Sequence, residues 1–496
     1  MKKILIIAIL AGSMISCKKF LAERSQTEVI PKTTKDFGEI LYTAGYPTNQ
    51  TYLQQFIALM DDDVQCYNSD LLADQQPAIT MYAPAFQWQP DFIERCTAAN
   101  DGLASTRYNS WRTYYKLILG TNVALQYMDN SIGSDAEKTM YKGEAYALRA
   151  FYHFMLVNLY ARPYNDSTTT PDKIPGIPLR LNADLSDQFP ARNTVKEVYD
   201  RITTDIDSAI YLLDKVSGQR LYRISNVAAH LLASRVYLYM EQWDKAIEHA
   251  DYVLRYHPQL INMNNWNPTP DPITQPVLGA NSIETIWYYA PSDEPVSPLM
   301  NAAYRVSHNL YDCYEEHDLR KTFYCAEVPD YLKPYISGDF IFLKAVPFGG
   351  TDMGLAFRSS EAYLNRAEAY CQKYRSKGDV AAANEALKSL NTLRASRIET
   401  ASFTNWTVKA PDVLLDMCRT ERRRELCVEG AQRWFDLRRY GMPAIQHIFQ
   451  PTPSTQVVYE LSKHDPQYTL PIPTDAVQRN SGIVQNPQIN GLRMPR

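Results

Sequence analysis

The chain has 496 residues and a formal net charge of −4, from 51 lysines and arginines against 55 aspartates and glutamates. This length is ample for a large hydrophobic core, in one elaborate domain or in two. The mildly acidic balance argues against nucleic-acid binding, which needs an excess of cations to neutralise phosphates.

The N-terminus predicts an exported lipoprotein. A short basic region at residues 1–3 precedes an unbroken apolar run over residues 4–10, and small residues then lead to Cys17. This pattern is typical of a secretory signal peptide over residues 1–16, with a lipid-carrying cysteine directly after the cleavage site. Its removal takes two lysines and no acid, so the formal charge changes from −4 to −6. No later apolar run approaches the ~20 residues of a membrane-spanning helix, so we expect lipid on Cys17 to be the anchor.

Helical periodicity dominates the middle and the end of the chain. Apolar residues recur at three- and four-residue spacing over residues 112–129, 137–160, 195–213, 226–240, 243–256, 359–373, 380–397 and 412–428. Two segments, 228–254 and 362–390, are alike, because each has an aromatic near the end of a first helix, a polar turn and an alanine-rich second helix. This is the pattern of tetratricopeptide hairpins, which bury their apolar faces by stacking. We therefore predict a mostly α fold with a tetratricopeptide-like scaffold, mainly over residues 104–257 and 358–441.

Long segments of little periodicity interrupt the helices at residues 60–95 and 257–300. Loops of this length in a folded protein are usually functional or disordered. These segments are rich in Trp and Tyr, which disordered segments lack. We therefore predict a large irregular lobe, mainly residues 45–100 and 258–357, that packs on the helices and carries the ligand contacts.

The sequence carries no recognisable catalytic, nucleotide or metal motif. Residues 348–356 have the glycine spacing of a phosphate loop, but Leu355 and Ala356 stand where a lysine and a hydroxyl residue belong, so we interpret the segment as a turn. The eight histidines show no metal-ligand spacing, and His153 and His230 lie inside apolar helices, as core residues do. No G-x-S-x-G motif occurs. We expect no catalysis, no cofactor and no metal.

Three consecutive carboxylates, Asp61, Asp62 and Asp63, could supply oxygen ligands to calcium. The pattern of an EF-hand loop is missing, however, and adjacent carboxylates usually face water. We expect them to be solvated, with calcium binding as the alternative.

Seven cysteines besides Cys17 make an odd number, which excludes a complete disulfide framework. Cys418 and Cys427 lie nine residues apart on one predicted helix, about 13 Å along its axis, which is too far to bridge. The pairs left open are Cys66 with Cys96 and Cys313 with Cys325. We expect most of the seven to be buried free thiols.

Aromatic residues are the most informative side chains of the irregular segments. On the predicted helices they are best explained as core, but in the irregular segments they stand beside Asn, Gln and Asp. That combination suits sugars, because a ring stacks on the C–H face and polar groups bond the hydroxyls. The rings concerned are Tyr67, Tyr82, Trp88, Trp266 and Tyr289. Each ring alone could equally pack onto the helices, but as a group they favour a binding surface.

A series of motifs extends over nearly the whole mature chain. They are CKKFL (17–21), EVIPKTTKDFGEIL (28–41), GEAYALRAFYHFMLVNLYARPY (143–164), IPGIPLR (174–180), FPARNTVKEVYDRITTDIDSAIYLL (189–213), FRSSEAYLNRAEAY (357–370), LNTLRASR (390–397), ERRRELCVEGAQRWFDLRRYG (421–441) and YTLPIPTDAV (468–477). In these motifs and in their order, the chain resembles the SusD/RagB lipoproteins of the Bacteroidetes. One such motif would be weak evidence, but their common order along the chain is specific.

The resemblance implies a single α-rich domain over residues 17–496, anchored by the lipid on Cys17 at the outer membrane and exposed at the cell surface. Family members act without catalysis as the lid of a SusC-like TonB-dependent transporter and capture oligosaccharides for uptake, and some bind peptides. Lys18 and Lys19 stand where acidic residues would favour surface export, so the periplasmic leaflet stays an alternative.

The resemblance also bears on the ligand residues. Trp88 precedes the helix that begins WRTYYKLI, where family members often place a stacking aromatic, and Trp266 and Tyr289 fall in the second variable segment. Tyr67 and Asp91 are chosen by their neighbourhood. The hypotheses are glycan capture, peptide capture with the same anchor and partner, and a secreted glycan hydrolase, which would need two carboxylates across a cleft.

The arginine-rich stretch 418–441 holds seven arginines and four carboxylates. Arg422 falls on the apolar face of a predicted helix, where a charge must be paired. The pairs available at helical spacing are Glu421 with Arg424, Arg422 with Glu425, and Glu429 with Arg433. Gly430 suits the left-handed residue that ends this helix before another one begins. We interpret the stretch as an internal structural clasp whose main residues are Glu421, Arg422, Glu425, Arg433 and Asp436.

Overall fold

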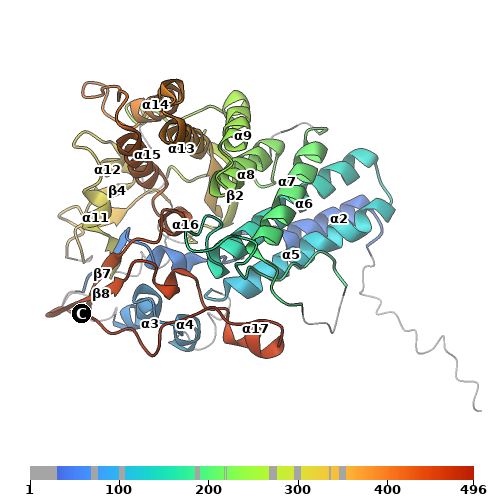
Figure 1. Ribbon diagram of the computed structural model, residues 1–496, viewed down its shortest axis with the longest axis horizontal. Coiled ribbons are helices and arrows are strands. Elements are labelled where there is room, and N and C mark those ends of the chain that lie inside the picture. Colours follow the sequence, from blue (N-terminus) through green and yellow to red (C-terminus); the bar gives the residue numbers. More distant parts are fainter. Residues whose placement is uncertain are drawn as a thin grey trace, which may run out of the picture.

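The computed structural model describes residues 31–68, 76–99, 107–184, 190–216, 218, 220–266, 276–294, 303–334, 337–345 and 353–496. Helices are the main regular element, so the predicted mostly α fold is confirmed (Figure 1). The long helices are α5 (Ser110–Tyr127), α6 (Asp135–Tyr160), α7 (Val195–Leu213), α8 (Asn226–Tyr239), α9 (Trp243–Tyr256), α13 (Ser359–Lys377), α14 (Val380–Ala395) and α15 (Pro411–Leu426). Each agrees with a range predicted from apolar periodicity to within a few residues at either end.

Local sequence signals explain where these helices begin and end. Ser134 and Thr194 are the N-caps of α6 and α7, and each accepts a hydrogen bond from the N–H of a glutamate three residues later, whose side chain accepts one from the cap. These reciprocal bonds satisfy N–H groups that have no partner within the helix. Gly378 ends α13 with a φ of 66°, a left-handed conformation that glycine adopts without steric cost.

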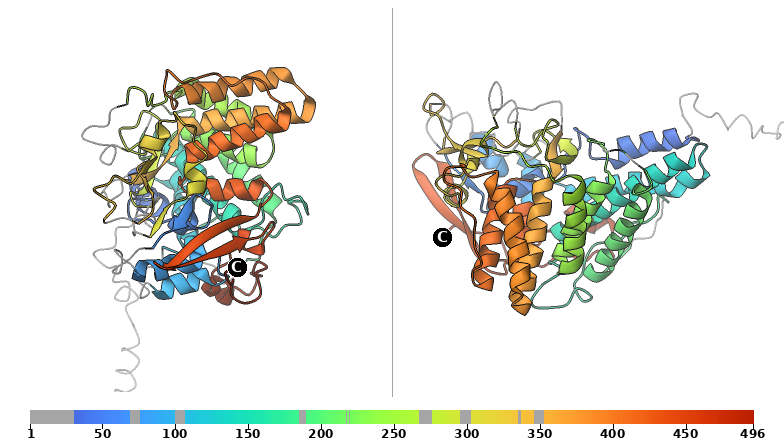
Figure 2. Two further views of the ribbon diagram at one scale, coloured as in Figure 1. Left: turned by 90° about the vertical axis from the view of Figure 1, so that its left-hand side faces the viewer. Right: turned by 90° about the horizontal axis from the view of Figure 1, so that it is seen from above.

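Two stacked helical hairpins form the scaffold that the sequence predicts. α8 packs on α9, α13 packs on α14, and the hairpins stack because α9 also packs along α13. α15 packs against the other side of this stack and closes a second hydrophobic cluster that includes Leu364, Leu390 and Leu415. In the right-hand view of Figure 2, these helices run down one side of the molecule, and the short elements of residues 303–345 lie on the other.

The rest of the described chain, the irregular lobe included, is built from short elements. The strands are β1 (Val64–Cys66), β2 (Thr285–Pro291), β3 (Tyr304–Val306), β4 (Cys325–Glu327), β5 (Phe340–Phe342), β6 (Met353–Arg358), β7 (Ile445–Thr452) and β8 (Thr455–Leu461). They pair antiparallel in twos, as β1–β3, β2–β6, β4–β5 and β7–β8. The shorter helices are α2 (Thr34–Ile40), α3 (Gln76–Phe86), α4 (Phe92–Ala99), α11 (His308–Tyr311), α12 (Arg320–Phe323), α16 (Gln432–Arg439) and α17 (Thr474–Arg479).

Two expectations for this lobe are wrong. The interval 60–95 shows little periodicity, yet it contains α3 and the start of α4. Residues 82–86 of α3 are all buried, so the helix has no polar face there to mark it in the sequence. Residues 353–356 of the expected turn lie in β6 instead, and the glycines at 349 and 350 are outside the described residues.

One hydrophobic core joins the lobe to the scaffold. The ring of Phe151 on α6 packs edge-on against Trp287 and Tyr289 of β2 and against Phe357 of β6, with centroids 5.6 Å apart in each pair. Edge-on aromatic pairs contribute ~0.5–1.5 kcal/mol beyond the area that they bury. The lobe is therefore held in place by the same core as the long helices.

Candidate binding site

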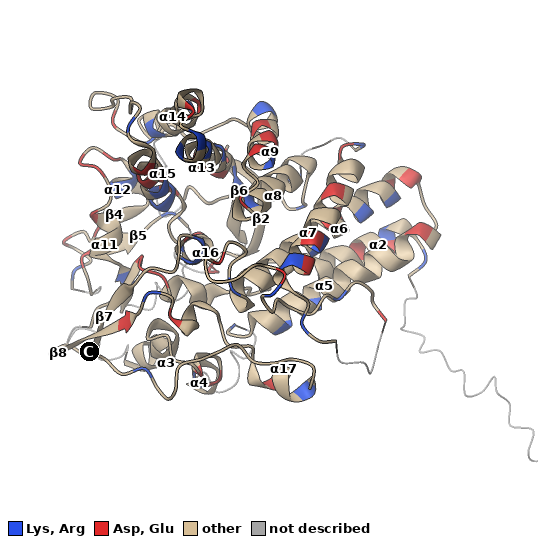
Figure 3. Cartoon of the chain, viewed as in Figure 1, with Lys and Arg blue, Asp and Glu red and all other residues tan. Residues whose placement is uncertain are grey.

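The arginine-rich stretch lies on α15, on α16 and in the turn between them, and its charged side chains face inward. Glu421, Arg422 and Glu425 have no exposed area, and Asp436 is buried as well. Positive and negative residues stand side by side on α15 (Figure 3). Gly430 has the predicted left-handed conformation, with a φ of 56°. Buried charges are destabilising by several kcal/mol each unless partners compensate.

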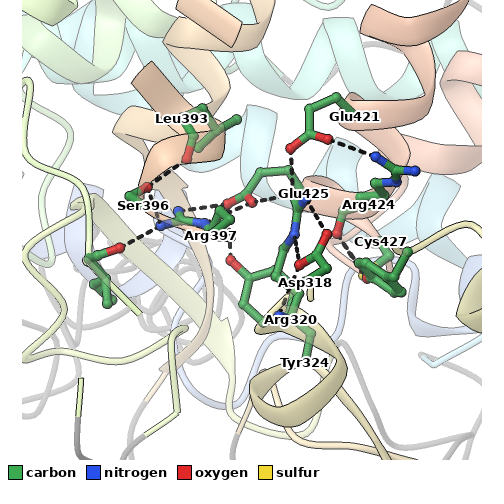
Figure 4. A network of polar contacts seen from close by, with 12 residues as sticks. Asp318, Arg320, Tyr324, Leu393, Ser396, Arg397, Glu421, Arg424, Glu425 and Cys427 are labelled. Atoms are coloured by element: carbon green, nitrogen blue, oxygen red, sulfur yellow. Dashed lines mark hydrogen bonds and ion pairs between the residues drawn. The ribbon is translucent and has the colours of Figure 1, made fainter. Parts of the chain in front are cut away.

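Glu425 lies at the centre of the clasp (Figure 4). Its carboxylate oxygens lie 3.0 Å from Arg397 and 3.1 Å from Arg320, which Figure 4 shows beside it. They also lie 2.7 Å from Arg358, and all of these side chains are buried. The Tyr324 hydroxyl donates to the same carboxylate at 3.0 Å. Burial by itself would raise the pKa of Glu425, but Arg397 and Arg358 outweigh burial and hold that pKa well below its ordinary value. The ionised carboxylate thus joins α15 to three other segments of the chain.

The predicted pair of Arg422 with Glu425 is wrong. Arg422 pairs instead with Asp436 of α16, at 3.0 Å. It also donates to an amide oxygen on α13 at 2.7 Å, so one side chain connects three helices. The predicted pair of Glu421 with Arg424 is confirmed at 3.3 Å. Helical spacing finds neighbours on one helix face, whereas Arg422 points into the interior and meets other elements.

Of the three consecutive aspartates, Asp62 and Asp63 pair with arginines of the clasp and Asp61 is buried beside them, so the expectation that they face water is wrong. Arg433 donates to both oxygens of Asp62, at 2.7 and 2.8 Å, in place of the predicted pair with Glu429. Arg423 contacts Asp63 at 2.7 Å and Asp62 at 3.3 Å. Burial opposes ionisation of Asp62, but the two arginines outweigh it and lower its pKa. Among the described residues, no group of three or more His, Cys, Asp or Glu is arranged to hold a metal ion.

Trp88 is a core residue, so its predicted role as a stacking platform for a ligand is wrong. Its side chain has no exposed area, its indole N–H donates to the Met60 carbonyl at 2.8 Å, and its ring stacks on His447 with centroids 4.0 Å apart. A ring without an accessible face cannot stack on a sugar. Tyr82 is buried in the same way.

The other candidates lie apart from one another. Tyr289 is largely buried and its ring stacks on a neighbouring ring of β2 at 4.3 Å, but it also lines a small hollow with Gln54 and Arg235, so its ligand role stays a prediction. Trp266 is half-buried against Phe323, with centroids 4.8 Å apart. Asp91 forms a partly exposed ion pair with Arg95 at 3.8 Å. For Trp266 and Asp91, a ligand role stays a prediction.

A hollow of about 470 Å³ opens in the irregular lobe between β1, the start of α11 and β7, and we refer to it as the β1–β7 hollow. Small-molecule sites typically span ~300–1,000 Å³. Its polar lining residues are Asp62, Gln65, Ser307, His308, Asn309 and Gln446. Val64, Ile445 and Ile448 supply apolar surface. These residues come from three segments far apart in the sequence, so no local pattern marks the site.

Tyr67 is the predicted ligand residue that the structure places beside this hollow. The ring is half-buried, and its hydroxyl donates to Gln65 Oε1 at 3.3 Å. His308, with half of its side chain exposed, packs edge-on against Phe340 with centroids 4.8 Å apart. Tyr311 stacks on the same Phe340 ring at 3.8 Å. An imidazole and three amides thus line the opening, and the Tyr67 ring lies beside one of these amides, that of Gln65.

A second polar cluster in the lobe surrounds Tyr52. The Arg107 guanidinium lies 4.3 Å from the centre of the Tyr52 ring and donates to its hydroxyl at 3.1 Å, while the hydroxyl lies 3.2 Å from Asp293. Next to Asp293, the buried Glu294 accepts the backbone N–H of Gln54 at 2.7 Å. Burial raises the pKa of Glu294 to about 7, although this N–H favours the charged form.

The β1–β7 hollow is suited to binding rather than to acid–base chemistry. Glycoside hydrolysis uses two carboxyl groups across a cleft, and one of them must hold a proton. Asp62 is the only carboxylate among the described lining residues, and its arginine partners keep it ionised. The remaining amide, imidazole and hydroxyl groups can bond the hydroxyls of a sugar or the amides of a peptide.

The described cysteines are free thiols, so neither pairing left open by the sequence forms a disulfide here. They are Cys66, Cys96, Cys313, Cys325, Cys371, Cys418 and Cys427. All but Cys313 are buried, in agreement with the expectation of buried thiols.

The predicted signal peptide and lipid anchor lie outside the described residues, which begin at residue 31. Lipid attachment at Cys17 therefore stays a prediction. Within the described part of the chain, none of the helices has the length and apolar character needed to cross a membrane.

Two family models match this chain. A model described as starch-binding and associating with the outer membrane matches residues 20–238, and a model of the SusD family matches residues 348–488. A curated relative, SusD-like protein P38 from Formosa agariphila, is 24% identical over 394 residues, which cover 67% of this chain and 72% of that protein.

Solved structures share the fold. A SusD superfamily protein from Bacteroides vulgatus superposes with a TM-score of 0.70 at 20% identity, covering 93% of this chain and 100% of that one. A SusD superfamily protein from Bacteroides thetaiotaomicron gives 0.67 at 22% identity, covering 92% and 100%. A structure from Bacteroides vulgatus described as a SusD-like carbohydrate-binding protein gives 0.63 at 18% identity, covering 91% and 97%.

Proposed function

Because this chain belongs to the SusD/RagB family, we propose that it captures oligosaccharides at the outer membrane without modifying them. The observation that carries the proposal is the β1–β7 hollow, with the half-exposed His308 among its lining residues and the half-buried Tyr67 beside it. Partly exposed rings stack on the C–H faces of sugars, and the amides of Gln65, Asn309 and Gln446 offer donors and acceptors to hydroxyls. A structural neighbour described as carbohydrate-binding supports the same ligand class.

We further propose that lipid on Cys17 holds the protein on the outer membrane at the cell surface. The pattern of residues 1–17 and the family description that places such proteins at the outer membrane support this anchor. Full-length protein expressed with labelled fatty acid should carry the label, and Cys17→Ala should not. Protease digestion of intact cells then separates the surface from the periplasmic leaflet, because only the surface protein is cleaved.

The proposed partner is a SusC-like TonB-dependent transporter that takes up the captured glycan. Modest affinity of the hollow suffices, because a partner that closes over the ligand adds contacts and raises the effective concentration. Co-purification of the transporter with the tagged lipoprotein from membranes tests the partner. Recovery of the lipoprotein alone under mild detergent would count against it.

Affinity electrophoresis of residues 18–496 against plant, host and microbial polysaccharides tests the ligand class. We expect retardation by at least one polysaccharide, and an affinity about tenfold lower for the double variant Tyr67→Ala, His308→Ala, because a stacked ring and a hydrogen bond together contribute ~1–2 kcal/mol. Tyr211→Ala is the matched control, since this α7 ring is 65% exposed and does not line the hollow.

The same protein distinguishes the alternatives. Binding of a peptide mixture in calorimetry, with no polysaccharide retarding the protein, would replace glycan capture by peptide capture. Release of reducing sugars from a polysaccharide would make the protein a hydrolase, and the pairing of Asp62 with two arginines predicts that none is released.

A further inference from the structure

The scaffold carries a hollow of its own. It measures about 690 Å³ and lies between α14 and the segment 403–408 that follows this helix. Its lining includes Asn384, Lys388, Phe403, Asn405, Trp406 and Thr407. None of its lining residues belongs to the clasp or to the β1–β7 hollow. The irregular lobe is therefore not the only part of the described chain with a place for a ligand.

Trp406 is held in position before any ligand binds. Asn391 of α14 accepts the backbone N–H of Trp406 at 2.8 Å and donates to its carbonyl at 3.0 Å. The Arg394 guanidinium lies 4.0 Å from the centre of the indole ring and donates to the Thr404 carbonyl at 3.0 Å. The ring nevertheless stays partly exposed and lines the hollow. A preorganised ring lowers the entropic cost of binding.

The polar side chains near this ring are available to a ligand. Asn384, Lys388, Asn405 and Thr407 are exposed, and within the described part of the chain their side chains form no hydrogen bond or ion pair. Amides and a hydroxyl supply both donors and acceptors. Lys388 is the only ionisable group among the described lining residues, so no carboxylate there repels an acidic ligand.

We propose that this hollow is a second glycan-binding site, in which a sugar ring stacks on Trp406 and the side chains of Asn384, Asn405 and Thr407 bond its hydroxyls. Lys388 allows the sugar to be neutral or acidic. The inference rests on the proposed function, glycan capture, and extends it from one site to two. A second contact on the same chain is intramolecular, so a polysaccharide that spans both sites is held more tightly than either site alone would hold it.

Calorimetry with maltohexaose, cellohexaose and a galacturonic acid hexamer tests the number of sites. We expect the wild-type protein to bind two molecules of at least one probe, and Trp406→Ala to bind one. The double variant Tyr67→Ala, His308→Ala should also bind one, through the scaffold site. Trp243→Ala, which removes a half-buried tryptophan from α9, should keep both sites. In affinity electrophoresis with the parent polysaccharide, Trp406→Ala should bind about tenfold more weakly.

Because Trp406 packs on Arg394, the triple variant Asn384→Ala, Asn405→Ala, Thr407→Ala is measured beside it. These side chains are exposed, so the triple variant should keep the wild-type melting temperature and still lose the scaffold site. A single wild-type site that depends on Tyr67 and His308 would overturn the second site and leave the proposed function standing. A wild-type protein that binds no probe and no polysaccharide would count against both.

Discussion

The clasp and the irregular lobe both bury glutamates, but they treat the charge in opposite ways. Burial would raise the pKa of Glu425, yet Arg397 and Arg358 hold it well below its ordinary value. Burial raises the pKa of Glu294 in the lobe to about 7, because its hydrogen-bond donors are mainly neutral backbone N–H groups. In a low-dielectric interior, a nearby cation offsets desolvation, whereas neutral donors offset it only in part.

This difference separates charged groups that stabilise the fold from polar groups that a ligand can reach. In the clasp, arginines hold the pKa values of Glu425 and Asp62 below their ordinary values and occupy their oxygens, so these carboxylates are not available to a ligand. In the β1–β7 hollow, His308 and Gln446 are exposed, and their partners Asp339 and Glu460 engage one nitrogen of each. Asp62 also lines the hollow, but its two oxygens bind Arg423 and Arg433. Burial of the paired group, more than its residue type, therefore separates the clasp from the hollow.

Glu425→Ala should produce the largest effect. It leaves three buried guanidinium groups, those of Arg320, Arg358 and Arg397, with one anion fewer. Breaking a buried ion pair from one side typically costs ~3–5 kcal/mol. We expect a fall of this size in the free energy of unfolding from urea denaturation, with unchanged glycan affinity in the folded fraction. Glu399→Ala, which removes a half-exposed glutamate, is the control and should change little. If Glu425→Ala kept its full stability but lost glycan binding, Glu425 would belong to the ligand site and not to a structural clasp.

The effect of Glu294 on how the free energy of unfolding changes with pH should be nearly as large as the effect of Glu425→Ala. A carboxyl with a raised folded-state pKa binds more protons in the folded chain than in the unfolded chain between its ordinary value of 4.5 and about 7. Its stabilising contribution is complete below pH 4.5 and is lost as the pH rises through 7. We expect wild-type protein to lose about 3 kcal/mol more stability than Glu294→Gln between pH 4.5 and 7.5 in urea denaturation. If the stabilities of the wild type and of Glu294→Gln changed with pH in parallel, the charge of Glu294 would be compensated as in the clasp.

Asp62→Asn tests a residue that lines the β1–β7 hollow and also pairs with arginines of the clasp. It removes the anion that Arg423 and Arg433 share, and bonds to charged groups contribute ~1–3 kcal/mol each. We expect a loss of about 1–3 kcal/mol in the free energy of unfolding, with glycan affinity unchanged in the folded fraction. Gln446→Ala, an exposed residue of the same hollow, should do the reverse and weaken binding at unchanged stability. Weaker binding by a stable Asp62→Asn would place Asp62 in the ligand site.

The helices and the burial of the clasp could be predicted from the sequence, because both follow from the spacing of apolar residues along the chain. Apolar periodicity placed α5 to α9 and α13 to α15 to within a few residues. An arginine at an apolar helix position, Arg422, indicated a buried charge. Its partner Asp436 could not be predicted, because spacing on one helix gives no information about α16. The same holds for Asp62, which precedes β1 in the chain and pairs with Arg423 and Arg433. The only sequence signal that these two segments meet is their opposite net charge, negative in residues 61–63 and positive in residues 418–441.

The residues of the candidate site were harder to predict from the sequence, because the exposure of a side chain depends on the tertiary structure. Trp88 and Tyr67 look alike in the sequence, each an aromatic in a segment without periodicity. His447, which lies 359 residues beyond Trp88, covers one of these rings, and Tyr67 stays half-exposed beside the hollow. No local sequence pattern marks Gln65, His308, Asn309 and Gln446, since the candidate site forms only where β1, α11 and β7 meet.

The smallest effect is expected from an exposed pair with the same spacing. Lys196 and Asp200 of α7 lie 2.6 Å apart at i and i+4, and their side chains are 51% and 54% exposed. If spacing alone made a pair stabilising, Lys196→Ala would resemble a clasp variant. Water screens this pair, and ordering two long side chains opposes its formation, so we expect no measurable change in melting temperature or urea midpoint. A loss as large as that of Asp62→Asn would mean that pairing, and not burial, sets the strength of these contacts, and the contrast between clasp and lobe would lose its physical basis.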